Sequence, residues 1–298
     1  MISKQIIYVA LITLLQLNLF AQEDDLMAMF DNSEPKTEYT DATFKTTLLV
    51  IGQTIETPLN GTLLLNVQHR FGSINSGLYD FFGLDQANTR IGFQYGVNNW
   101  LGIGIGRSSY LKTYDGWAKV KILRQSSGLR NMPISVDYFG SIAVSAVKWS
   151  EPDRKNYFSS RLSFSNQLLI ARKLSPGISL QLMPTHVHYN LVETRNMENN
   201  IFSVGMGGRF KLSKRISVNA EYYLLLSKET RKSYSDPFSI GIDIETGGHV
   251  FQLYLTNAQG IIEPHFIGRT SGKWQNGDIH LGFNISRSFT IKKPKEFR

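Results

Sequence analysis

The sequence contains no cysteine, which excludes a disulfide framework, a thiolate metal site, a cysteine nucleophile and an acylated lipoprotein cysteine. After the first 21 residues it also contains no run of about 18 apolar residues, so it predicts no transmembrane helix. Helical periodicity is almost absent as well. The stability of the folded chain must therefore come from side-chain packing and from pairing of the backbone.

The chain carries a formal net charge of +8, but it has no clustered basic helix and no aromatic platform on which bases could stack. These absences argue against nucleic-acid binding. The stretches "GIGIGR" and "GMGGRF" lack the third glycine and the following helix that a dinucleotide site requires. We therefore expect no nucleic-acid partner and no cofactor.

The first 21 residues have the form of a secretory signal peptide. A single early cation, Lys4, precedes the apolar run Ile6–Phe20, and cleavage is expected after Ala21. The alternative, an uncleaved anchor, is disfavoured because a bilayer-spanning helix needs about 20 apolar residues.

Residues 22–42 form an acidic segment whose only basic residue is Lys36. We expect a solvated periplasmic tail, and the alternative is a contact with a periplasmic partner. The acidic residues are Glu23, Asp24, Asp25, Asp31, Glu34, Glu38 and Asp41.

From about Gly61 onward, segments of roughly ten residues alternate between apolar and polar side chains, which is typical of a transmembrane β-barrel. The last segment shows the pattern most clearly, with Arg287 as the one interruption of its apolar face. One face holds Leu281, Phe283, Ile285, Phe289 and Ile291, and the other holds His280, Gly282, Asn284, Ser286 and Ser288. Because the polar faces are rich in Gly, Ser, Asn and Gln and poor in charge, we assign them to a confined lumen.

These segments predict an all-β, single-domain antiparallel barrel over residues 43–298, with 12 strands between Gly61 and Ile291. Short and long connections alternate, as expected for periplasmic turns and extracellular loops. A further strand candidate, Thr43–Ile55, precedes them. It can stay outside the wall, fold into the lumen, or split near Gly52 to give 14 strands, and we favour 12.

Three stretches carry a resemblance to a known family: "QHRFGSINSGLYDFFGLDQANTRIGFQYG", "GIGIGRSSYLKTYDGWAKVKILRQ" and "ETGGHVFQLYLTNAQGIIEPHFIG", with the closing "GDIHLGFNISRSF". From about Ala42 the chain resembles an uncharacterised family of membrane β-barrel proteins of Bacteroidetes-type outer membranes. The resemblance implies a barrel in the outer membrane of a Gram-negative bacterium. It brings no substrate and no catalytic residues.

The closing segment is also similar to the carboxy-terminal signal that the barrel-insertion machinery reads, although "TIKKPKEFR" continues past Phe289. The expected partners are this machinery and the lipids of the outer membrane.

Several charged residues are predicted on the lumen face. Basic side chains in a pore attract anions, so the pattern favours a weakly anion-preferring channel. The alternative is that paired charges brace the barrel, with Asp137 between Lys119 and Lys121 as the clearest case. The basic candidates are Arg70, Arg90, Lys119, Lys121, Arg161, Arg209 and Lys211, and the acidic ones are Asp137, Glu221, Asp243 and Glu245.

The predicted loop 72–88 is unusually apolar for a solvated loop, because it contains Leu78, Tyr79, Phe81 and Phe82. It is predicted either to fold inward as a plug or constriction, or to pack at the barrel rim. Inward folding would explain the glycines of the neighbouring strands.

His186 and His188 lie two residues apart on a predicted strand, so both imidazoles face one side, and Glu193 follows. They are weak metal candidates, because Pro184 interrupts that strand and such pairs are common in loops. No metal and no catalytic residue is predicted, since the remaining histidines are scattered and no nucleophile-elbow pattern appears.

The sequence thus favours passive or gated passage of small polar or anionic solutes. The alternatives are a closed structural or interaction barrel and, with less support, a lipid-acting outer-membrane enzyme. A sealed lumen would favour the closed barrel, and a Ser–His–carboxylate cluster on the outer wall would favour the enzyme.

Overall fold

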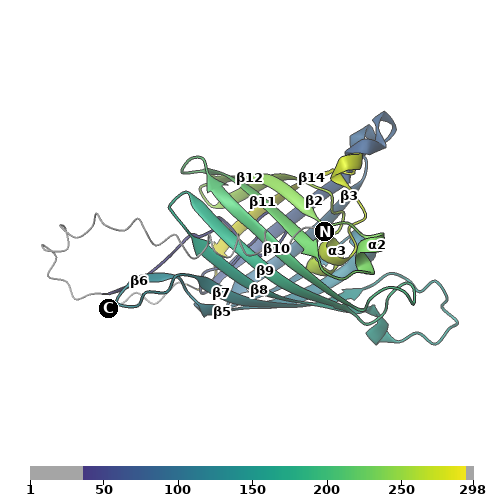
Figure 1. Cartoon of the computed structure of the whole chain (residues 1–298), viewed down its shortest axis with the longest axis horizontal. Coiled ribbons are helices and arrows are strands. Elements are labelled where there is room, and N and C mark those ends of the chain that lie inside the picture. Colours follow the sequence, from purple (N-terminus) through teal and green to yellow (C-terminus); the bar gives the residue numbers. More distant parts are fainter. Residues whose placement is uncertain (1–35, 293–298) are drawn as a thin grey trace, which may run out of the picture.

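A computed structural model describes residues 36–292, and the predicted signal peptide and most of the acidic segment lie outside this range. Twelve strands form a closed barrel in which every neighbouring pair is antiparallel and β14 pairs with β2 (Figure 1). The wall strands are β2 (Thr62–Ser73), β3 (Ala87–Gly96), β4 (Leu101–Ser108), β5 (Thr113–Leu123), β7 (Ser135–Ser145), β8 (Leu162–Lys173), β9 (Ile178–Tyr189), β10 (Asn200–Lys211), β11 (Ile216–Leu225), β12 (Phe238–Thr246), β13 (His249–Thr256) and β14 (His280–Thr290). The predicted 12-strand barrel is confirmed, and the 14-strand alternative is wrong.

The alternation of the sequence sets the two faces of this wall. In β12 the isoleucines at 240, 242 and 244 are exposed on the outside, while Gly241 and Asp243 point inward and are buried. The register places Ile242 opposite Leu253 of β13, so outward apolar side chains of neighbouring strands form a continuous belt. Among the described residues, no helix is both long and apolar enough to cross a membrane.

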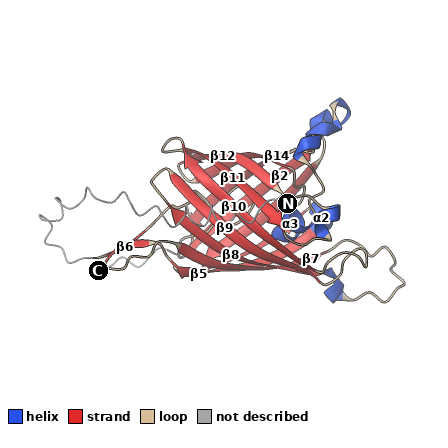
Figure 2. Ribbon diagram, viewed as in Figure 1, coloured by secondary structure: helices blue, strands red, loops and turns tan. Residues whose placement is uncertain are grey.

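The two ends of the barrel differ. At one end, here called the short-turn end, brief connections such as 97–100 and 212–215 join the strands. Outside the barrel at this end, β1 (Thr37–Tyr39) pairs with β6 (Ser126–Gly128). The opposite end, the long-loop end, carries longer connections and the short helices of the fold (Figure 2).

The helical elements within residues 36–292 are the 3₁₀ segments η1 (Ile74–Ser76), η2 (Leu78–Gly83), η3 (Tyr110–Lys112), η4 (Phe158–Arg161) and η5 (Trp274–Asn276), and the α-helices α2 (Thr230–Ser233) and α3 (Glu263–Gly268).

The hydrophobic core lies inside the barrel. Phe139, Leu169 and Met183 point inward from the wall and are fully buried. They belong to one cluster with side chains of two segments that enter the lumen, such as Leu49 and Phe266. The interior is therefore packed like the core of a soluble domain.

If the apolar face meets lipid, the cost of placing an arginine on it should depend on how deep the position lies in the membrane. We expect Ile242→Arg to destabilise the inserted barrel by about 2–4 kcal/mol, because its position faces outward near the middle of β12. Thr246→Arg, which faces outward at the end of the same strand, should cost about 0–1 kcal/mol. Reversible urea unfolding in vesicles measures both values, and equal costs would contradict the assignment.

Candidate functional site

The strand candidate Thr43–Ile55 lies inside the barrel and forms no part of the wall. Residues 43–57, here called the lumen hairpin, enter from the short-turn end, turn back at 49–52 and lead into β2. Thr54 donates its backbone N–H to Thr47 O (3.0 Å), and Leu49 donates to Gly52 O (2.8 Å). An isolated bridge between Leu48 and Gln53 joins the two arms. Of the three alternatives for this segment, folding into the lumen is the one that the structure shows.

The tip of the lumen hairpin is bound by a single carboxylate. The backbone N–H groups of Val50, Ile51 and Gly52 donate to the Glu221 oxygens at 3.3, 2.8 and 3.0 Å. A Cβ at Gly52 would overlap the hydroxyl of Tyr223, so the close approach of the tip to the wall requires glycine there. Glu221, predicted to face the lumen, does so, but it binds the hairpin and not solvent.

Amide side chains of the wall bind the remaining backbone of the lumen hairpin. Gln181 accepts from Ile55 N (3.0 Å) and donates to Gln53 O (2.7 Å). Asn284 donates to Val50 O (2.9 Å), and Gln252 donates to Leu49 O (3.1 Å). The Gln- and Asn-rich inner face thus supplies partners for backbone groups that would otherwise be buried without hydrogen bonds.

A second segment closes the barrel from the long-loop end. In the connection between β13 and β14, residues 257–270, here called the lumen loop, contain α3, all of whose residues are buried. Arg70 donates to Ala258 O (2.9 Å) and to Gly260 O. The two inserted segments meet where Gln53 Nε2 donates to Glu263 Oε1 (3.0 Å). In α3, outside the strands, burial lowers the pKa of His265 to about 3, so its imidazole is neutral.

Two other predicted lumen cations bind peptide carbonyls of the lumen hairpin and its flank. Lys119 Nζ donates to Thr54 O (2.7 Å) and Glu56 O (3.0 Å), and Arg209 donates to Ala42 O (3.2 Å). Lys119 is fully buried. Neither cation is paired with a wall carboxylate in the described part of the chain.

Arg90 behaves differently, because it forms a buried ion pair with Asp115. Its Nε lies 2.9 Å from Asp115 Oδ1, and Nη1 donates to Gln68 (2.9 Å). Asp115 could not be predicted as the partner from sequence, because the pair joins β3 to β5 across β4 and alternation alone does not show which strands are neighbours. Arg90 therefore braces the wall.

The other predicted charges lie nearer the short-turn end. Asp137 is buried and is the register partner of Lys121. Asp243 accepts from Gln252 Nε2 at 2.9 Å, and Glu245 pairs with Lys45 of the lumen hairpin. Lys211, the last residue of β10, is half-buried.

The prediction for Arg161 is wrong. It lies in η4 at the long-loop end, where its guanidinium stacks on Trp149 (3.9 Å to the ring centroid) and donates to Ser145 O (2.8 Å). It therefore orders a loop and does not line the lumen.

The inward-folding alternative for loop 72–88 is also wrong, and although Ile74 donates its backbone N–H to Ile279 O at the rim, the apolar side chains of the loop do not pack there. It extends β2 and β3 beyond the barrel (Figure 1), and Leu78, Tyr79, Phe81 and Phe82 are exposed, Tyr79 by 95%. The glycines of the neighbouring strands have another cause. A Cβ at Gly104, for example, would overlap the inward-facing Trp117 ring.

His186 and His188 face outward near the long-loop end of β9, and both approach Asn200 Oδ1 of β10, at 3.0 and 2.8 Å. The described residues contain no cluster of three or more His, Cys, Asp or Glu side chains that could hold a metal ion. In this part of the chain the two imidazoles share Asn200 as their hydrogen-bond partner, and neither has a Ser or Thr hydroxyl as a partner.

Comparison with solved structures finds several barrels of low sequence identity. A KdgM porin is 9% identical, with 76% of this chain and 99% of that chain covered and a TM-score of 0.49. Omp33 of Acinetobacter baumannii is 10% identical over 78% and 100% of the two chains (TM-score 0.40), and outer membrane phospholipase A of Escherichia coli is 9% identical over 77% and 90% (TM-score 0.43).

No curated protein matches the sequence. A family model does match it, over residues 44–289, which include nearly all of the lumen hairpin and of the barrel wall. The chain therefore belongs to the family described as a membrane bound beta barrel domain (DUF5777).

Proposed function

We propose that this protein is an outer-membrane barrel that gates the passage of small polar or anionic solutes, with the lumen hairpin as its gate. The proposal rests on what the buried cations of the lumen bind. Arg70 binds peptide carbonyls of the lumen loop, Lys119 binds those of the lumen hairpin, and Arg209 binds that of Ala42, which directly precedes the hairpin. Carbonyl oxygens carry only partial negative charge, so an anion can replace them when the inserted segments move aside.

The contacts of the lumen hairpin suit a movable part. Most of its hydrogen bonds go to wall side chains, and water can replace these partners when the hairpin leaves, so the net cost of breaking each bond is about 0.5–1.5 kcal/mol. Leu49, Val50 and Ile51 oppose opening because each is only 1% exposed in the closed state. The closed state therefore dominates and spontaneous openings are rare, and an input at the short-turn end, where the chain preceding the hairpin emerges, would make them more frequent.

Single-channel conductance in a planar bilayer tests this function. We expect the wild-type protein to be closed most of the time and to open in discrete steps that prefer anions in a salt gradient. Lys119→Gln combined with Arg209→Gln should lower the anion preference of the openings by about threefold, because two of the lumen cations are lost.

Arg161→Gln is the matched control, since it removes a cation that lies outside the lumen and should leave the selectivity unchanged. If the open channel of the double variant has the selectivity of the wild type, the lumen cations do not act on the permeating ion.

The second candidate function is a closed interaction barrel. It is favoured by the apolar cluster that joins the wall to both inserted segments. If no conductance is seen in the bilayer, even with variants whose hairpin is shown to be released, the result would support this function over gated passage.

In either case we propose that the protein lies in outer-membrane lipid, is placed there by the barrel-insertion machinery, and presents residues 22–42 to a periplasmic partner. The last residues of that segment, which the structure describes, lie at the short-turn end. There the Arg124 guanidinium carbon lies 4.2 Å from the centroid of the Tyr39 ring, and Arg124 Nη2 lies 3.4 Å from Asp41 Oδ1.

A further inference from the structure

The outward-facing positions of the twelve wall strands hold no carboxylate in the described chain, yet they hold three arginines: Arg107, Arg172 and Arg287. An arginine on a lipid-facing wall is costly unless its guanidinium reaches a polar partner. Arg107 lies over the ring of Tyr114, 5.6 Å from its centroid, and Arg287 lies over Phe289 at 5.0 Å. Arg172 has no such aromatic partner among the described residues, so its guanidinium needs another explanation.

The Arg172 side chain is half-buried, and its Nε atom is fully buried without a hydrogen-bond partner. No ion pair within residues 36–292 includes it. A half-buried guanidinium without an acceptor in the described chain is a site that a further group can complete. Because a guanidinium offers several donors in one plane, the group that suits it best is a carboxylate or a phosphate.

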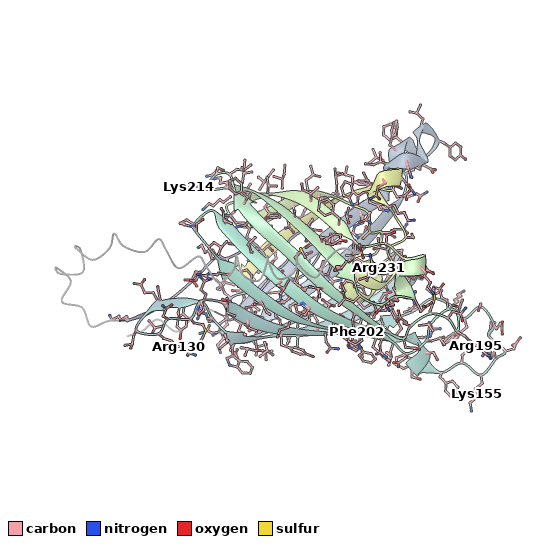
Figure 3. All side chains as sticks on the ribbon, in the orientation of Figure 1. Arg130, Lys155, Arg195, Phe202, Lys214 and Arg231 are labelled. Atoms are coloured by element: carbon pink, nitrogen blue, oxygen red, sulfur yellow. The ribbon has the colours of Figure 1, made fainter. Side chains whose placement is uncertain are left out.

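The position of Arg172 favours phosphate. It is the penultimate residue of β8, at the short-turn end, and its register partner is the outward-facing Leu180 of β9. In Figure 3 the same end of the barrel carries the labelled Arg130 and Lys214. Side chains at the ends of membrane-spanning strands lie at the depth of lipid headgroups, where phosphate is the abundant anion.

A depression of the outer wall begins at Arg172 and continues across β9 and β10 to β11. Its lining includes Ile170, Leu180, Leu182, Met206 and Ala220. These side chains are apolar and outward-facing, and Leu180, Leu182 and Met206 are each at least 40% exposed. The depression therefore places a surface suited to an acyl chain directly beside a cation suited to a phosphate.

We propose that Arg172 binds the phosphate of a glycerophospholipid in the leaflet at the short-turn end, with one acyl chain lying in this depression. The Nη groups of the half-buried guanidinium donate to the phosphate oxygens. The site lies on the outer wall and does not depend on whether the lumen opens.

Native mass spectrometry tests the site. The full mature chain is refolded into vesicles of palmitoyl-oleoyl phosphatidylglycerol and extracted into mild detergent, and the fraction that retains one phospholipid is measured. We expect Arg172→Gln to lower this fraction about tenfold and Arg172→Lys to lower it less, because an ammonium keeps the charge but loses the planar pair of donors.

Arg287→Gln is the matched control, since it removes an outward arginine at the same end that already lies over an aromatic ring. Ala220→Trp tests the other half of the site, because it fills the depression without changing charge. It should lower retention as much as Arg172→Gln, and the folding of each variant is checked by its heat-modifiable mobility.

Inorganic phosphate separates the lipid from its headgroup. An excess of phosphate should leave the bound lipid in place, because free phosphate gains nothing from the depression. Displacement by phosphate alone would overturn the acyl part of the proposal. Equal retention by Arg172→Gln, Ala220→Trp and Arg287→Gln would overturn the site as a whole.

Discussion

A Thr46→Cys, Ser286→Cys double variant is expected to be silent in a planar bilayer when oxidised and to recover its openings when a thiol reductant is added. The two hydroxyl oxygens, one on the lumen hairpin and one on β14, lie 3.5 Å apart. Sulfur atoms at these positions need only a small shift to reach the S–S bond length of about 2.05 Å. Because the chain has no other cysteine, this bridge would be the only one, and it would fix the hairpin to the wall.

The size of the effect follows from the fold. If the lumen hairpin is the gate, a covalent link to β14 removes every open state that needs the hairpin to leave, so oxidation should abolish conductance and not merely reduce it. The two single-cysteine variants are the controls and should conduct like the wild type under both conditions. Openings that persist in fully oxidised protein would show that solutes pass without movement of the hairpin.

Glu221→Gln is expected to release the tip of the hairpin. The carboxylate accepts the N–H groups of Val50, Ile51 and Gly52 in the protein interior, whereas an amide offers one acceptor oxygen and places an NH₂ group against the remaining donors. Each buried donor left without an acceptor costs about 1–3 kcal/mol. Since about 1.4 kcal/mol changes an equilibrium tenfold, the released state should become at least about tenfold more populated.

A thiol at position 47 reports this release. Thr47 is buried, and its hydroxyl has no hydrogen-bond partner, so Thr47→Cys disturbs little in the closed state. We expect labelling of this cysteine by a water-soluble maleimide to be at least about tenfold faster in the Glu221→Gln background.

The matched control for this experiment is Glu245→Gln. It removes the carboxylate that pairs with Lys45 of the same hairpin, but the Glu245 side chain is 45% exposed, so its loss should change the labelling rate less than about twofold. Equal labelling rates in the Glu221→Gln and Glu245→Gln backgrounds would mean that Glu221 does not hold the tip.

The wall of this barrel could be predicted from sequence, because a period of two residues is a local property. The alternation of Ile240, Gly241, Ile242 and Asp243 fixes both the strand and its two faces without knowledge of any other part of the chain. Inward positions of Arg70, Lys119 and Glu221 followed from the same pattern.

The contents of the lumen could not be predicted in this way. Glu221 and Val50 are separated by 171 residues, and no local pattern links them. The sequence therefore left the segment Thr43–Ile55 open among three alternatives. The location of loop 72–88 was predicted wrongly for a related reason. Its composition shows that it carries apolar side chains, but not whether another part of the molecule covers them.

The contacts of the lumen hairpin also bear on how the wall closes. The hairpin continues directly into β2, and it binds β14 through Asn284, whose amide reaches Val50 O across 234 residues of sequence. The β14–β2 pair is the last seam of the cylinder, and joining two strands so far apart in the chain is intrinsically slow. By holding β14 beside the start of β2, the hairpin raises the effective concentration of β14 near the strand with which it must pair. We therefore expect the segment that closes the lumen to serve also as an internal template for the assembly of the wall around it.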